Sequence, residues 1–204
     1  MNRSHGARPR LYLGVGFVWL VASLVGSWSG GLQRLRPPAP QLVLLGLTAA
    51  LILLAVSVEG LRAWLRDLDL RWFLGPHITR LVIGLYFLSL SRQGTLPTAF
   101  GVPAGWGDAA VGSLALLLVA TGPPGTSGRR RWYARWNWLG FLDLLFVVGT
   151  AARTALADPP SMNALLRLPL SLLPTFWVPI LLASHVVLLR RLERARPAVV
   201  PGTA

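Results

Sequence analysis

Long apolar blocks alternate with short polar segments along the whole chain. The residues between the blocks are mostly Arg, Pro, Gly and Asp. About 20 apolar residues is the length that an α-helix needs to cross the hydrocarbon core of a bilayer. The pattern therefore predicts an all-α fold, a polytopic transmembrane helical bundle in a single domain. Its six spans are expected at about residues 11–29, 41–58, 77–92, 103–121, 136–156 and 166–189.

A seventh, shorter pattern lies between the second and third blocks. Apolar and charged residues there take opposite faces of a helix, with Leu61, Trp64, Leu65, Leu68 and Trp72 on one side and Arg62, Arg66 and Asp69 on the other. This pattern predicts a short interfacial amphipathic helix that lies on the inner membrane surface as an anchor.

Composition supports a lipid environment. Of the 204 residues, 13% are charged and 53% are hydrophobic, whereas soluble domains carry roughly 25% charged residues. The chain has no cysteine, which excludes disulfides, thiolate nucleophiles and cysteine-based metal sites. The sequence predicts neither a cofactor nor a metal site.

The basic residues predict the orientation. All 20 are Arg, the formal net charge is +13, and they lie at the ends of apolar blocks. This distribution favours membrane orientation over binding of nucleic acid, which is not expected as a partner. One side collects fifteen of them, at positions 3, 8, 10, 62, 66, 71, 80, 129, 130, 131, 135, 190, 191, 194 and 196.

The other side holds five, at positions 34, 36, 92, 153 and 167. Since positive residues accumulate on the cytoplasmic side, both termini are expected in the cytoplasm, with 190–204 as a basic, Pro-containing tail. The absence of Lys indicates a GC-rich bacterial genome, and hence the bacterial inner membrane.

The first block follows a basic leader and is either a cleaved signal or a retained span. Ala22, Gly26 and Gly30 form a stripe of small residues that is typical of close helix packing in lipid. We expect a retained span, and the stripe is compatible with a homo-oligomer.

Two ionisable residues inside the predicted spans are candidates for chemistry, because charges within hydrocarbon are costly. Asp143 and His185 are expected at similar depths, about 10 and 7 Å from the inner surface at the helical rise per residue. A pair could clamp two helices, relay protons, bind a cation or ligate metal or haem. His77, expected at headgroup level, is the one further histidine that a haem could use.

A second polar focus lies on the outer side. Residues 93–107 are rich in Gly and Pro yet uncharged, which indicates either a re-entrant segment or a surface loop. Arg92 and Asp108 flank this stretch, and we expect them to pair and to be candidate ligand-binding residues of an outward-facing pocket.

Three segments carry a resemblance. The stretch 94–112 (GTLPTAFGVPAGWGDAAVG), the stretch 136–144 (WNWLGFLDL) and the stretch 173–179 (LPTFWVP) resemble a group of uncharacterised bacterial integral membrane proteins. The resemblance covers roughly the C-terminal two thirds. It implies a multi-helix inner-membrane protein and no particular activity.

These features favour a non-enzymatic role, either in transport of a small solute or proton or in membrane assembly. The alternative is a membrane-embedded oxidoreductase or hydrolase that uses Asp143 and His185.

Overall fold

The computed structural model describes residues 9–194, and all regular structure in this range is helical. Six helical segments are long and apolar enough to cross a membrane, which confirms the predicted all-α, six-span class. The long helices are α1 (Pro9–Trp28), α2 (Ala39–Ser57), α5 (Thr79–Arg92), α6 (Thr98–Ala120), α7 (Ser127–Ala157) and α8 (Val178–Arg194). The predicted basic leader up to Arg8 and the tail beyond residue 194 lie outside the described residues.

Shorter segments connect these helices. They are α3 (Glu59–Asp67), α4 (Arg71–Leu74), the 3₁₀ turns η1 (Leu32–Arg34), η2 (Gly75–Ile78) and η3 (Pro159–Leu166), and the π turn η4 (Leu173–Trp177). The third candidate span combines α4, η2 and α5, and the sixth combines η4 and α8.

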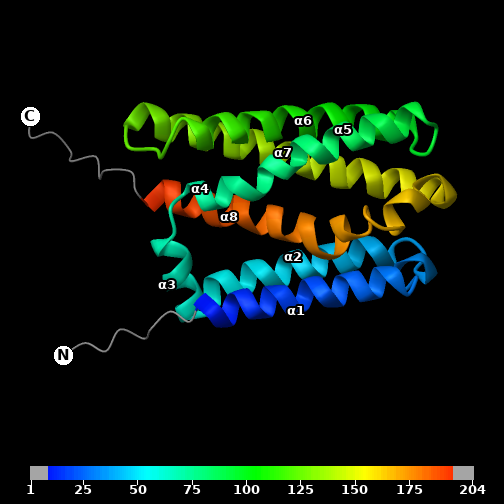
Figure 1. The fold of residues 1–204 in the computed structure, drawn as a ribbon, viewed down its shortest axis with the longest axis horizontal. Coiled ribbons are helices and arrows are strands. Elements are labelled where there is room, and N and C mark those ends of the chain that lie inside the picture. Colours follow the sequence, from blue (N-terminus) through cyan, green and yellow to red (C-terminus); the bar gives the residue numbers. More distant parts are fainter. Residues whose placement is uncertain (1–8, 195–204) are drawn as a thin grey trace, which may run out of the picture.

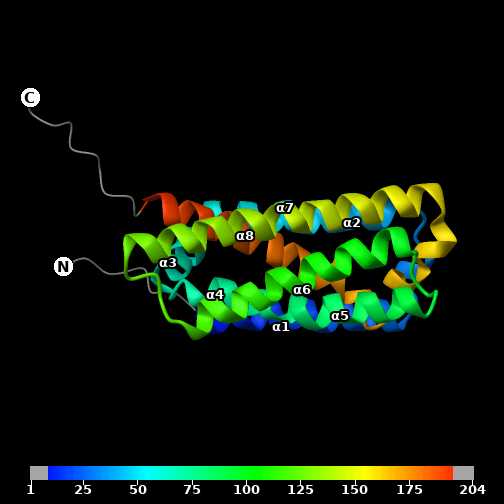
Figure 2. The ribbon, with the colours of Figure 1, turned by 90° about the horizontal axis from the view of Figure 1, so that it is seen from above.

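The long helices run side by side along one axis, with α8 between α2 and α7 (Figures 1 and 2). The start of α1 and the end of α8 lie at the same end of the bundle as α3, which we call the α3 end (Figure 1). The opposite end carries η1 and η3, and we call it the η3 end. This arrangement follows from six antiparallel segments joined by short connections.

The amphipathic helix predicted between the second and third spans is α3. It lies across the end of the bundle where α1 begins and α8 ends (Figure 1). The ring of Trp64 packs on that of Tyr12 in α1, with 5.5 Å between centroids. Arg191 Nη1 of α8 donates to the carbonyl oxygens of Leu65 at 3.2 Å and Leu68 at 2.5 Å. These contacts fix α3 against two spans, and its seat on a lipid surface stays a prediction.

The segment after α3 carries an exposed ion pair. Arg71 Nη2 lies 2.9 Å from Asp69 Oδ2, and the hydrogen bonds from Arg71 lower the pKa of the Asp69 carboxyl below its ordinary value. Such an exposed pair contributes little to stability.

The stretch 93–107 is neither a re-entrant segment nor a surface loop. A tight turn with Gly94 at a φ of +70° follows α5, and α6 begins at Thr98 and continues through Pro103. The helix begins five residues before the predicted span, 103–121, and Pro103 lies inside it. Close contact with α5 keeps the additional turn helical despite the backbone donor that Pro103 lacks.

Helix α1 packs at the periphery, mainly against η4. Trp19 contacts Phe176 with ring centroids 4.8 Å apart, and Ser23 Oγ donates to the carbonyl oxygen of Thr175 at 3.3 Å. The Ala22, Gly26 and Gly30 stripe is not part of this contact, since Ala22 is exposed and a β-carbon at Gly26 would meet open space. A homo-oligomer through the stripe stays a prediction.

Glycines allow α5 and α6 to approach each other closely. A β-carbon on Gly84 of α5 would lie 2.6 Å from the backbone nitrogen of Ala109 and would also overlap the carbonyl oxygen of Gly105. Gly112 of α6 meets the backbone of Leu81 in the same way. Because backbone atoms cannot swing aside as side chains do, these contacts require glycine.

We expect Gly84→Ala to lower the thermal unfolding midpoint of the detergent-solubilised protein, because overpacking at a backbone contact costs about 1 to 3 kcal/mol. Gly46→Ala in α2 is the matched control, since its β-carbon meets nothing within 4 Å and Ala has the higher helix propensity. Equal midpoints for the two variants would contradict the close α5–α6 contact.

Candidate functional site

A buried arginine lies at the centre of the bundle and bonds to two aspartates. The Arg80 side chain is 1% exposed. Its Nε donates to Asp108 Oδ1 at 2.6 Å, its Nη1 donates to the carbonyl oxygen of Gly140 at 3.0 Å, and its Nη2 donates to Asp143 Oδ2. We call Arg80, Asp108 and Asp143 the Arg80 cluster. One guanidinium thereby joins α5, α6 and α7.

The local sequence places Arg80 inside the bundle. Pro76 interrupts the third span, and the 3₁₀ turn η2 follows the short helix α4. Residues three apart lie above one another in a 3₁₀ turn, so His77 and Arg80 both face inward and both are buried. Thr79 Oγ1 donates to the carbonyl oxygen of Pro76 at 2.7 Å and accepts from Trp177 Nε1 at 2.6 Å, which holds this turn against η4.

The two aspartates of the cluster lie near the middle of their helices. Asp108 is ten residues beyond the start of α6 and twelve before its end, or roughly 15 Å from the nearer end. Asp143 is sixteen residues beyond Ser127 and fourteen before Ala157. In a bilayer these positions correspond to the hydrocarbon core, where an unpaired charge is most costly.

Two glycines make room for the site. A β-carbon on Gly107 of α6 would overlap the carboxylate of Asp143, so the missing side chain lets Asp143 lie across α6 toward Arg80. A β-carbon on Gly140 of α7 would lie 2.9 Å from His185 Cε1. The same residue presents its carbonyl oxygen to Arg80, so Gly140 separates the Arg80 cluster from the histidine.

The expected Asp143–His185 pair does not form. His185 Nδ1 instead lies 2.9 Å from Asn137 Oδ1, and Asn137 Nδ2 donates to the His185 carbonyl oxygen at 3.2 Å. Asp143 turns the other way, to Arg80. The rotation of α7 directs Asn137 and not Asp143 at His185, and Asp143 lies sixteen residues into α7, deeper than expected.

His77 is not a solvated residue at headgroup level. It is fully buried, and its ring lies 4.3 Å from the His185 ring and 5.1 Å from Trp136, centroid to centroid. His77 Nε2 lies 2.8 Å from Ser184 Oγ. The two imidazoles touch, so no porphyrin fits between them. His77 Nδ1 and His185 Nε2 have no hydrogen-bond partner in residues 9–194.

The expected Arg92–Asp108 pair is also absent. Arg92 is exposed at the η3 end of α5, whereas Asp108 is 3% exposed. Because α6 begins five residues earlier than expected, Asp108 moves from the outer end of its helix to the middle, where Arg80 is its partner.

Arg80 was not among the predicted site residues, because it was counted with the arginines of the cytoplasmic side although it lies within the predicted span 77–92. Two signals could have identified it. It is the one charged residue between Arg71 and Arg92, and two aspartates inside predicted spans require a buried cation to balance them.

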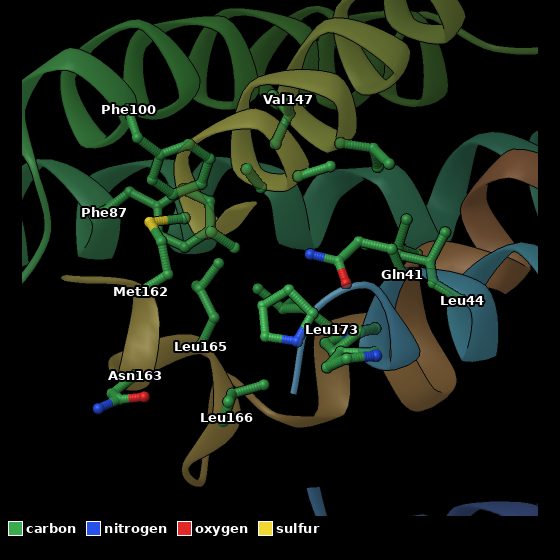
Figure 3. A pocket seen from close by; sticks show the side chains of 18 of the residues that line it. Gln41, Leu44, Phe87, Phe100, Val147, Met162, Asn163, Leu165, Leu166 and Leu173 are labelled. Atoms are coloured by element: carbon green, nitrogen blue, oxygen red, sulfur yellow. The ribbon is translucent and has the colours of Figure 1, made fainter. Parts of the chain in front are cut away.

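A cavity of about 280 Å³ reaches the cluster from the η3 end, and we call it the central pocket. Apolar side chains of α2, α5, α6, α7, η3 and η4 form its walls, and Arg80 and Asp108 are at its inner end. Figure 3 shows Phe87, Met162 and Leu173 gathered around the space, with the amide of Gln41 directed into it. Toward the α3 end the bundle is filled by a core that includes Phe73, Leu74, Tyr133, Trp136 and Leu188.

Polar groups meet the central pocket at two levels. Gln33, Arg36 and Asn163 line it at the η3 end, and all three are exposed. Deeper, Gln41 Oε1 is buried without a hydrogen-bond partner in the described part of the chain. An apolar pocket with few convergent polar groups is the usual form of a small-molecule site.

No group of three or more His, Asp or Glu side chains in residues 9–194 is placed to hold a metal ion. The arrangement can exchange a proton, pair with a charged group or hold helices together, all through Arg80 and its two carboxylates.

A family model described as a domain of unknown function, DUF8737, matches residues 37–193. The match covers more than half of the chain, which therefore belongs to this family. It includes the whole Arg80 cluster and both buried histidines, whereas α1 lies before it. No curated protein and no solved structure matches the chain.

We expect Arg80→Gln to destabilise the protein by about 3 to 5 kcal/mol, because it leaves two buried carboxylates without their cation. Arg71→Gln is the matched control, since it breaks only an exposed pair, and its unfolding midpoint should stay close to that of the native chain. Unfolding by sodium dodecyl sulfate in mixed micelles measures both. A tolerated Arg80→Gln would show that the carboxylates are not held by Arg80.

A double-mutant cycle tests which partner Asp143 has. Asp143→Asn and Arg80→Gln should be strongly non-additive in unfolding free energy, by about 1 kcal/mol or more, because they share one ion pair. Asp143→Asn and His185→Ala should couple more weakly. The reverse order would restore the Asp143–His185 pair expected from the sequence.

Proposed function

We propose that this member of the DUF8737 family is a multi-pass protein of the bacterial inner membrane, with both termini in the cytoplasm, and that it binds a small amphipathic solute as a component of its transport. The observation that carries the proposal is the central pocket, which joins the η3 end of the bundle to a charged cluster in the middle.

The outer surface of the bundle supports the membrane location. Large apolar side chains of α1 are mostly exposed, including Val15 at 62%, Phe17 at 65% and Val18 at 67%. A surface of this kind would aggregate in water and suits contact with lipid. Arg80 is buried and no longer counts toward the side with more arginines. That side still has the larger number, which favours cytoplasmic termini.

The pocket supports solute binding over a purely structural role. Close packing normally fills the interior of a bundle, because voids lose dispersion contacts. Here the α3 end is filled, whereas the half toward the η3 end encloses 280 Å³. An ion cluster with a purely structural role would not need a cavity that leads to the Asp108 carboxylate.

A solute for this site needs an apolar body and a hydrogen-bond donor. The walls are apolar and would exclude a strongly hydrated molecule. Gln41 Oε1 in the wall and Asp108 at the inner end are both acceptors. The enzyme alternative receives less support, because the Asp143 and His185 pair on which it rests is replaced by separate contacts.

Calorimetric titration of 1-octanol into the protein in phosphatidylcholine nanodiscs tests the proposal. We expect saturable binding at one site. Ala151 lies in the pocket wall, so the larger side chain of Ala151→Trp should fill the pocket and abolish the heat of octanol binding. Leu145→Trp on the same helix is the control, because Leu145 is 45% exposed on the outer surface, and it should leave binding intact.

Empty nanodiscs supply the background for partition into lipid. Equal heats from the native protein, from Ala151→Trp and from empty nanodiscs would show that the central pocket binds no such molecule.

A further inference from the structure

The Arg80 cluster carries more negative than positive charge. Two carboxylates surround one guanidinium, so with all three groups ionised the formal charge is −1. An uncompensated charge in the middle of a membrane-spanning bundle is costly. The cluster is neutral only when one further positive charge, a proton or another monocation, is present.

Groups on the neighbouring elements do not supply that charge. The titratable side chains around Asp108 are Arg80 from α5 and Asp143 from α7, and His185 from α8 and His77 from η2 lie near Arg80. The histidines bond to Asn137 and Ser184, and neither bonds to a carboxylate of the cluster. In residues 9–194, Arg80 is the one cation in contact with Asp108 and Asp143.

Asp108 is the carboxylate that the central pocket reaches. Its Oδ1 accepts from Arg80, and the described residues give its Oδ2 no donor. An apolar group packed against this oxygen would leave a buried acceptor unsatisfied, which costs more than an unmade bond in water. An ammonium group at the same place would satisfy the oxygen and also neutralise the cluster.

We propose that the solute of the central pocket is a monocationic amphiphile, a protonated amine with an apolar body, which exchanges with a proton at the Arg80 cluster. This inference rests on the proposed function. One cation enters as one proton leaves, so the cluster is neutral in both states. The apolar body lies along Val147 and Leu173, and the ammonium group contacts Asp108 at the inner end.

The exchange explains why two aspartates accompany one arginine. A single aspartate would balance Arg80 fully, and the cluster would then have no place for a second cation. The second carboxylate creates a site that is always occupied by one of two competitors. Competition at a shared site couples the movement of the amine to that of a proton.

The test compares octylammonium, 1-octanol and octanoate on the protein in phosphatidylcholine nanodiscs, in weak buffer with a pH indicator. Charge-assisted hydrogen bonds exceed neutral ones by enough that octylammonium should bind about tenfold more tightly than octanol. It should release about one proton per site, and its affinity should fall as the pH is lowered. Octanoate should bind most weakly.

Asp108→Asn should remove the preference for octylammonium and the proton release while octanol still binds. Asp158→Asn is the matched control, because Asp158 is an exposed carboxylate at the η3 end, and it should behave as the native chain. If Asp108→Asn does not fold, the proton release and ligand order of the native protein decide the question.

The outcomes separate the two proposals. Failure of all three compounds to bind overturns the proposed function together with this inference. Octanol and octylammonium binding equally, with no proton release, leaves the solute pocket intact and overturns the cation–proton exchange. If NaCl released protons to the same extent as octylammonium, the site would be assigned to an inorganic cation. This result would overturn the proposal that the solute is an amine.

Discussion

The guanidinium of Arg80 lies away from water, and its charge must be balanced by groups on other helices. Asp108 of α6, Asp143 of α7 and the carbonyl oxygen of Gly140 provide that balance. Ion pairs in a medium of low polarity are costly to bury and still more costly to break. The relative positions of α5, α6 and α7 are therefore restricted to those that keep all three contacts, and the close α5–α6 approach through Gly84 and Gly112 satisfies this restriction.

The same cluster gives the central pocket its polarity. The bundle is closely packed between the cluster and the α3 end, whereas toward the η3 end its apolar core surrounds the central pocket. A solute that enters passes the polar residues Gln33, Arg36 and Asn163 at the η3 end, then apolar walls, and meets a carboxylate last. The apolar walls select molecules that partition into lipid. The surplus negative charge of the Arg80 cluster selects those with a positively charged head group.

Hydropathy and periodicity were sufficient to predict the six spans and the amphipathic helix, because both depend on local sequence. The site needed information that these patterns do not contain. Arg80 was counted with the arginines of the cytoplasmic side because the 3₁₀ turn at Pro76 hides that the third span begins at Arg71. Asp108 was placed too close to the outer end of its helix, because α6 begins at Thr98, within the Gly- and Pro-rich stretch, and not at Pro103. The pairing of Asp143 depended on the rotation of α7, which Gly107 and Gly140 determine through contacts with other helices. Depth alone could not distinguish Arg80 from His185 as its partner.

The central claim is that the Arg80 cluster is present for the solute, because apolar side chains in place of all three charged groups would hold the bundle together equally well. The triple variant Arg80→Met, Asp108→Val, Asp143→Val replaces all three charged groups by apolar side chains, and buried ion pairs replaced in this way are often neutral for stability. Its unfolding free energy and its octylammonium binding should be measured on one preparation in nanodiscs. The account predicts a folded protein within about 1 kcal/mol of the native chain and no octylammonium binding. A triple variant that is as unstable as Arg80→Gln alone, or one that still binds octylammonium with release of a proton, would contradict it.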